Sequence, residues 1–197
     1  YHFFSHSDTE VILKAYHHWG EDCVLYLDGM FAFAIWNQAK QQLFMARDRM
    51  GIKPFYYSLS NKAITFASNT QALLTQNINK SINPIALQQQ LSLHGVVPAP
   101  NTIIKGIRKV RPATTITINK SGKFIEKTYW QPIAKRPIEK LSDGEYIEKT
   151  HELLTEAVMK RMSAADVPIG VLLSGGLDSY LLVGLLHEAG HQDIRTF

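Results

Sequence analysis

The residues best suited to chemistry in this 197-residue sequence form the run Ser174-Gly175-Gly176-Leu177-Asp178-Ser179. The apolar residues 169–173 predict a strand that leads into this run, and the apolar residues after it predict a helix. Open α/β sheets bind ligands outside the carboxyl ends of their strands. The free N–H groups and the dipole of the following helix favour an anion there. Since glycine allows close backbone approach and positive φ, the run predicts a phosphate-binding loop.

Asp178 leaves two interpretations of the loop open. In the first, the glycines form a flexible turn and Asp178 only caps the helix. In the second, which the complete Ser-Gly-Gly-x-Asp-Ser pattern favours, Asp178 orients the loop or holds Mg²⁺, because a bare carboxylate beside phosphate is unfavourable. The run is not the Gly-x-x-x-x-Gly-Lys-Ser/Thr loop, because no lysine follows the glycines.

The elements before the loop predict a strand-rich first part of the chain. Apolar side chains at helical spacing predict a helix over residues 8–19. Short apolar runs separated by turn residues, among them Asn37, Gly51 and Asn61, predict four strands, at residues 30–36, 42–47, 54–58 and 63–67. The first run is apolar on both faces, as expected of a central strand. Two helices and a hairpin complete this part, at residues 69–75, 84–93 and 113–127.

The last part of the chain predicts a second domain. Pro132, Pro137 and the charges between them indicate a linker at residues 131–141. Ser142-Asp143-Gly144-Glu145 has the form of a capping box at the start of a long amphipathic helix, and Gly190 ends the helix that follows the loop. We therefore expect an α+β sandwich over residues 1–130 and the start of an α/β domain over 142–197.

Composition narrows the class of protein. Hydrophobic residues make up 45% of the chain, enough for one large core or two smaller ones. No apolar run approaches the ~20 residues that cross a bilayer, so we expect a soluble protein without a membrane partner. Cys23 stands alone, which argues against a disulfide framework and favours a cytoplasmic location. There is no initiator Met or signal peptide, and both ends resemble cuts.

Basic residues concentrate in one stretch of the sequence. Residues 101–140 contain ten of the 21 basic side chains and two of the 17 acidic ones. A solvated connecting surface is the favoured interpretation, and a patch that attracts polyphosphate or nucleic acid is the alternative. Charge alone does not choose between them.

Several motifs together resemble a known family. The run 174–179 resembles the PP-loop of ATP pyrophosphatases, which hold the β,γ-pyrophosphate and cleave ATP between the α and β phosphates. Five further blocks occur upstream in family-like order: Ser7-Asp8-Thr9-Glu10, Gly29-Met30-Phe31-Ala32, Ala46-Arg47-Asp48-Arg49, Phe66-Ala67-Ser68 and Val97-Pro98-Ala99-Pro100. Over essentially the whole chain they resemble the glutamine-hydrolysing asparagine synthetases. The match runs from the later part of the class II, N-terminal-nucleophile glutaminase domain into the PP-loop synthetase domain.

The resemblance implies a two-site, ATP- and Mg²⁺-dependent carbon–nitrogen ligase. One site hydrolyses glutamine, and the ammonia released passes to the other. There a carboxylate attacks the α-phosphorus of ATP, pyrophosphate leaves, and ammonia displaces AMP from the acyl-adenylate. Small molecules are the implied partners, with no nucleic acid, and a homodimer of the full-length protein is compatible with the resemblance. Aspartate is the default acceptor; N-acetylglutaminylglutamine and a non-enzymatic relative are the alternatives.

Site residues are carried over by position. Asp8 matches the aspartate that holds the glutamine α-amino group, although Ser7-Asp8-Thr9-Glu10 also has the form of a capping box. Leu172 matches the position whose backbone contacts adenine in the family. The positions that bind pyrophosphate are matched by Ser174, Gly175, Gly176, Asp178 and Ser179. No catalytic residue is assigned, because the nucleophilic Cys is expected upstream of Tyr1. The chain alone is therefore expected to be inactive.

Two groups of residues are expected to be structural. Cys23 is interpreted as a small packing residue. The second group is expected to form a turn with ion pairs and consists of Arg47, Asp48, Arg49 and Lys53. A rival RNA-modifying PP-loop enzyme would explain the loop and the basic stretch, but not residues 1–127.

Overall fold

The computed structural model describes residues 1–60, 63–135 and 140–197. The chain divides into two compact units, Tyr1–Ile133 and Ala134–Phe197, which are described separately. The expected turn at Asn61 and part of the expected linker, residues 136–139, lie outside the described residues. Within the described residues no helix is both long and apolar enough to cross a membrane.

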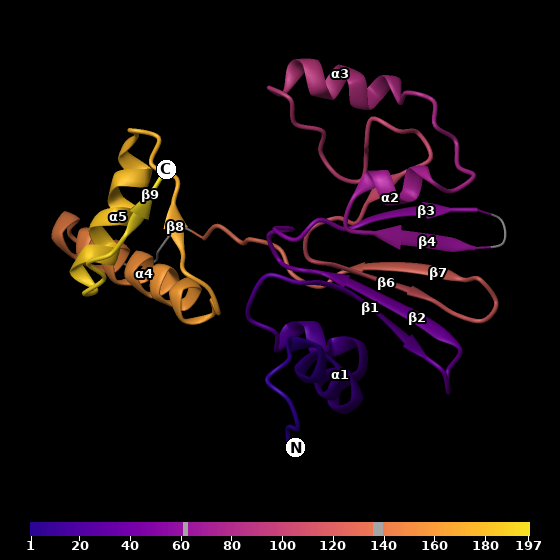
Figure 1. Cartoon of the computed structure of the whole chain (residues 1–197), viewed down its shortest axis with the longest axis horizontal. Coiled ribbons are helices and arrows are strands. Elements are labelled where there is room, and N and C mark those ends of the chain that lie inside the picture. Colours follow the sequence, from indigo (N-terminus) through magenta and orange to yellow (C-terminus); the bar gives the residue numbers. More distant parts are fainter. Residues whose placement is uncertain (61–62, 136–139) are drawn as a thin grey trace. The chain divides into compact units, whose positions relative to one another are not determined.

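In its described residues the first unit consists of two antiparallel sheets and four helices (Figure 1). The four-stranded sheet has the order β1-β2-β6-β7, with β1 (Ala32–Asn37), β2 (Gln42–Arg47), β6 (Thr114–Ile118) and β7 (Phe124–Thr128). The three-stranded sheet has the order β4-β3-β5, with β3 (Tyr56–Leu59), β4 (Ile64–Ala67) and β5 (Arg108–Lys109). The helices are α1 (Asp8–Trp19), the 3-10 helix η1 (Gly20–Leu25), α2 (Thr70–Leu74) and α3 (Pro84–Ser92).

Strand β2 separates two apolar cores, because successive side chains of a strand point to opposite faces. Phe44 and Ala46 are fully buried on the face that α1 and η1 cover, where they pack with Ala15 and Cys23. Met45 is fully buried on the other face, in a cluster that includes Tyr57 of the second sheet. The first unit is thus layered as helix, sheet and sheet (Figure 1), which confirms the predicted α+β sandwich.

The pairing of the strands corrects one prediction. Strand β1 is covered on both faces as expected, with Ile35 in one core and Ala34 against the other. It is nevertheless an edge strand of its sheet in the described residues, and β2 lies between β1 and β6. Burial of both faces depends on the layers above and below a strand, and does not require a neighbour on each side.

The second unit contains a parallel strand pair and two helices. They are α4 (Asp143–Ser163), β8 (Gly170–Val171), α5 (Leu177–Glu188) and β9 (Arg195–Thr196). Strands β8 and β9 run parallel, and the Leu173 N–H extends the pairing by donating to the Phe197 carbonyl at 2.8 Å. The predicted start of an α/β unit is therefore confirmed.

Local signals located most of the elements. The helix predicted over residues 8–19 and the strand predicted over 42–47 have the observed bounds. The capping box at Ser142 and Glu145 is present in both directions, and Gly190 follows α5 with a φ of 90°. Helix η1 and strand β5 were not predicted, because η1 is a short 3-10 turn and β5 is defined by its pairing with β3.

Arg47, at the end of β2, joins three segments of the first unit. Its guanidinium donates to the carbonyls of Lys53 at 2.8 Å, Val110 at 2.6 Å and Gly51 at 2.6 Å. The side chain is 9% exposed. Burial lowers the pKa of this guanidinium, and the nearby Asp48 carboxylate partly opposes that shift. The guanidinium has five N–H donors in a fixed planar arrangement, so it can bond to several carbonyls at once. The dipoles of these carbonyls compensate its positive charge.

Asp48 completes the turn that Arg47 supports. Its two carboxylate oxygens accept from the backbone N–H groups of Ile52 at 2.9 Å and Lys53 at 3.0 Å. The Tyr129 hydroxyl donates to the Arg47 carbonyl at 2.8 Å, which ties the residues after β7 to the same turn. The expected structural turn is confirmed, but its ion pairs are not: within the described residues the side chains of Arg47, Asp48 and Arg49 bond to the backbone.

Replacing Arg47 with Ala should lower the free energy of unfolding by about 2–4 kcal/mol, because the buried carbonyl of Val110 and the part-buried carbonyls of Lys53 and Gly51 lose their donor. Arg47→Lys should recover little of this loss, since a lysine ammonium cannot donate to the same three carbonyls in the planar geometry of a guanidinium. Urea denaturation measures both. Arg111→Ala is the control: among the described residues its side chain pairs with Glu126 at 3.8 Å on the surface, and the change should cost at most about 0.5 kcal/mol. An Arg47→Ala midpoint equal to that of the control would contradict the structural role.

Candidate functional site

The predicted phosphate-binding loop joins β8 to α5 in the second unit. Gly175 has a φ of 80°, which favours glycine, whereas Gly176 has an ordinary φ of −88°. Gly176 is the N-cap residue of α5 and provides no side-chain hydrogen bond. Asp178 lies within the first turn of the helix. The interpretation of Asp178 as a plain N-cap is therefore wrong.

The backbone amides of this loop have no partner in the described part of the second unit. No N–H group from Gly175 to Ser179 donates to a described residue, and the loop residues are largely exposed. The hydroxyl oxygens of Ser174 and Ser179 lie 3.2 Å apart, and the Ser179 hydroxyl also donates to the Gly176 carbonyl at 2.9 Å. Backbone N–H groups that serve the fold are almost always paired. The N–H groups of this loop are exposed and unpaired, so they can donate to an anion from outside the chain.

The remaining predicted residues of the loop are also exposed. Leu172 is 79% exposed, and its backbone makes no hydrogen bond to another described residue. The Asp178 carboxylate likewise has no hydrogen bond or ion pair to a described residue. No group of three or more His, Cys, Asp or Glu side chains among the described residues could hold a metal ion by itself. Mg²⁺ commonly binds through one or two carboxylates together with substrate phosphates, and one carboxylate at this loop fits that pattern.

Asp8, the other predicted ligand residue, belongs to the first unit. It occupies the first turn of α1 and is exposed. The helix is capped by the residue before it, because the Ser7 hydroxyl oxygen accepts from the Thr9 N–H at 3.2 Å. Among the described residues the Asp8 carboxylate makes no hydrogen bond or ion pair, so it remains available to a ligand.

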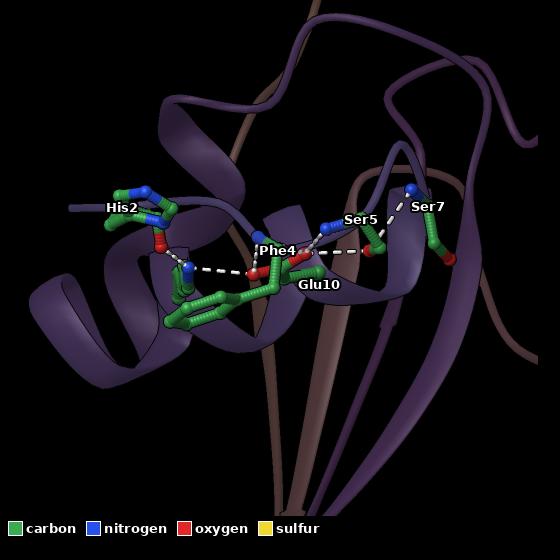
Figure 2. A network of polar contacts seen from close by, with 6 residues as sticks. His2, Phe4, Ser5, Ser7 and Glu10 are labelled. Carbon is green, nitrogen blue, oxygen red and sulfur yellow. Dashed lines mark hydrogen bonds and ion pairs between the residues drawn. The ribbon is translucent and has the colours of Figure 1, made fainter.

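The expected capping box at Ser7 and Glu10 is not formed, because the Ser7 hydroxyl oxygen accepts from the Thr9 N–H and not from that of Glu10. The Glu10 carboxylate does not reach back to Ser7; it accepts from the backbone N–H groups of Phe4 at 2.9 Å and Ser5 at 2.7 Å, and from the Ser5 hydroxyl at 2.6 Å (Figure 2). The reason is that the chain before Ser7 turns back over the helix, which brings closer donors to Glu10. Sequence analysis missed this contact, although aromatic residues before a Glu10–Lys14 pair at i,i+4 spacing were a visible signal.

These contacts stabilise the charged form of Glu10. A hydrogen bond from Lys14, followed by those from Ser5 and Phe4, lowers the pKa of the Glu10 carboxyl from 4.5 to about 2. Lys14 lies 2.6 Å from the carboxylate and also donates to the His2 carbonyl. The segment before α1 is thus fastened to the helix through one acidic side chain.

Cys23 has the packing role that was expected. Its side chain is fully buried in the core beneath α1. Burial raises the pKa of the thiol to about 11, so the nucleophilic thiolate is disfavoured at neutral pH.

Part of the basic stretch lines a cavity of about 630 Å³ in the first unit. Its cationic side chains already have partners: Arg49 donates to the Leu27 carbonyl at 2.6 Å, and Lys109 donates to the Val97 carbonyl at 2.6 Å. Arg47 and Arg111, also in the lining, have the partners described above. Arg47, Arg49 and Lys109 therefore hold loop carbonyls, whereas Arg111 forms a surface ion pair.

Comparisons with known proteins match both units. Residues 1–130 match the glutamine amidotransferase domain family, and residues 149–197 match the asparagine synthase family. Glutamine-hydrolyzing asparagine synthetase 1 of Bacillus subtilis is 38% identical over 100% of this chain and 30% of its own length. A putative glutamine-hydrolyzing asparagine synthetase 2 of Methanocaldococcus jannaschii is 39% identical over 92% of this chain and 35% of its own length.

One solved structure is a more distant match. Glutamine phosphoribosylpyrophosphate amidotransferase from B. subtilis, complexed with ADP and GMP, has a TM-score of 0.44 and 16% identity. The match covers 100% of this chain and 40% of that chain.

The contacts of Glu10 predict a pH dependence for the segment before α1. Because the folded-state pKa is depressed, the contribution of these contacts to stability is complete above about pH 4.5 and is lost as the pH falls toward 2. An NMR titration of the Ser5 amide should show a midpoint near pH 2, and Glu10→Gln should abolish that transition. A midpoint near 4.5 in the unaltered chain would contradict the hydrogen bonds.

Proposed function

Since this chain belongs to the glutamine-hydrolysing asparagine synthetase family, as its motifs suggested, we propose that the full-length protein transfers ammonia from glutamine to a carboxylate at the expense of ATP. The chain spans about 30% of the length of a curated relative that it matches, so both activities are proposed for the full-length protein. The observation that carries the proposal is the loop at 174–179, where a row of unpaired amides lies between a parallel strand and a helix.

The loop is proposed to hold the pyrophosphate of ATP. The N–H groups of Gly175, Gly176 and the first turn of α5 would donate to phosphate oxygens, as helix N-termini commonly do. The hydroxyls of Ser174 and Ser179 would add two donors. As pyrophosphate leaves, negative charge builds on its oxygens, and donors that are already oriented stabilise that charge without further reorganisation.

Leu172 and Asp178 would complete the nucleotide site. The strand pairing uses the backbone of Leu173, and leaves the N–H and carbonyl of Leu172 available to the edge of adenine. Asp178 would hold Mg²⁺, which supplies charge neutralisation to the phosphates. A carboxylate needs this activation by ATP because it is a poor electrophile until one of its oxygens becomes part of a leaving group.

The first unit is proposed to bind glutamine. The exposed Asp8 carboxylate would pair with the α-amino group of the substrate, and Ser7 supports this because it performs the capping that would otherwise occupy Asp8. Cys23 is buried, so the proposal assigns no nucleophile to these 197 residues. Aspartate is the proposed acceptor, since the relatives described above are named asparagine synthetases.

Asp8→Asn in the full-length protein should raise the KM for glutamine at least tenfold, because the α-ammonium loses its ionic partner. Ammonia-dependent synthesis should be unchanged, since it does not use the glutamine site. Steady-state glutaminase and synthetase assays measure the two activities. Asp22→Asn, a change at an exposed aspartate of η1, is the control and should leave the KM for glutamine unchanged. An unchanged KM in Asp8→Asn would refute the assignment.

Gly175→Ala should weaken ATP binding about tenfold, because a residue with a side chain is strained by about 1–2 kcal/mol at a φ of 80°. Gly184→Ala is the matched control in α5: an added Cβ meets nothing within 4 Å there, and alanine favours the helix. Calorimetric titration with ATP and Mg²⁺ compares the variants. Equal affinities for ATP in the two variants would count against the loop as the nucleotide site.

A further inference from the structure

The direction of Asp8 is set by the turn that precedes it. Among the described residues Asp8 has no side-chain partner, so the backbone at the start of α1 sets the position of its Cβ and the region that its carboxylate can reach. That start is linked to Glu10: the Ser5 hydroxyl donates to Glu10 at 2.6 Å and accepts from the Ser7 N–H at 3.3 Å (Figure 2). Ser7 in turn caps the helix on Thr9. These hydrogen bonds therefore connect the residues before Asp8 to Thr9 and Glu10, which follow it in the helix.

Lys14 fixes the other end of this network. Its ammonium pairs with Glu10 at 2.6 Å and lies 4.4 Å from the ring centre of Phe3 and 4.8 Å from that of Phe4. The side chains of Lys14 and Glu10 are only 19% and 16% exposed, so water screens this pair less than an ordinary surface pair. The segment 2–5 is thus held on the helix by charge, hydrogen bonds and aromatic contacts together.

The network also distinguishes two carboxylates that lie in one helical turn. Glu10 accepts from Lys14 and from the donors of Phe4 and Ser5, whereas Asp8 has no side-chain partner among the residues that the structure describes. A substrate ammonium that approaches this helix end therefore meets one available carboxylate. If Lys14 did not neutralise Glu10, the two acidic groups would compete for the same cation.

We propose that Glu10 and Lys14 are positioning residues of the glutamine site, which aim the Asp8 carboxylate and make it the single acceptor for the substrate α-ammonium group. This inference rests on the proposed function, and goes beyond it by assigning selectivity for α-amino substrates to two residues that do not touch glutamine.

The test compares two substrates in the full-length protein: glutamine and 4-carbamoylbutanoate, which is glutamine without its α-amino group. Glu10→Gln should lower kcat/KM for glutamine about tenfold, mainly through KM, and change that for 4-carbamoylbutanoate less than about twofold. The preference for glutamine is the ratio of its kcat/KM to that of 4-carbamoylbutanoate. Lys14→Met, which retains apolar contact with the two phenylalanine rings, should also reduce this preference. If the two residues had only a general structural role, their replacement would lower kcat/KM for both substrates by the same factor. That result would overturn the inference.

Glu145→Gln is the matched control. Glu145 also accepts from a serine hydroxyl and from a backbone N–H before a helix, but it caps α4 in the second unit, so the preference for glutamine should stay unchanged. In an Asp8→Asn background, Glu10→Gln should have no further effect on that preference; an additive effect would refute action through Asp8. If Asp8→Asn itself left the preference unchanged, the proposed glutamine site would fail, and this inference with it.

Discussion

The buried guanidinium of Arg47 is the contact on which the first unit most depends. It bonds to carbonyls on the loop after β2 and to Val110 beside β5, while the Val110 N–H donates to the Phe55 carbonyl before β3. Both sheets are therefore tied to one side chain at the end of a central strand. The Tyr129 hydroxyl adds the residues after β7 to the same group. Removing the guanidinium would leave the buried carbonyl of Val110 and two part-buried carbonyls without this donor, so we expect this position to tolerate little change.

The use of hydrogen-bonding groups separates structural residues from candidate ligand residues. Around Arg47, Asp48 and Lys109, donors and acceptors are satisfied within the unit. At the 174–179 loop, amides and the Asp178 carboxylate have no partner among the described residues. Both regions have motifs that attract attention in the sequence. The structure distinguishes them because a saturated group stabilises the fold, whereas an exposed unsaturated group can bind a ligand at little cost of desolvation.

Two glutamates with the same spacing from a serine show how tertiary context changes a local motif. Glu145 reaches back to Ser142 and completes a capping box. Glu10 has the same position after Ser7 but bonds to Phe4 and Ser5. The difference arises because residues 2–5 lie against α1 and offer nearer donors, with Lys14 beside them. Equal spacing in sequence therefore produced a cap in one helix and an anchor for the chain in the other.

The sequence by itself determined the features that depend on neighbouring residues. Periodicity located α1 and β2, the Ser142 box located the start of α4, and the glycines located the loop before α5. The candidate ligand residues came from the loop motif and from the family resemblance, and they stay predictions. Only the tertiary structure decided that β1 is an edge strand, that Arg47 bonds to carbonyls and that Glu10 anchors the preceding segment. The physical reason is that strand order and the partners of long polar side chains depend on groups brought together by folding, which local spacing does not encode.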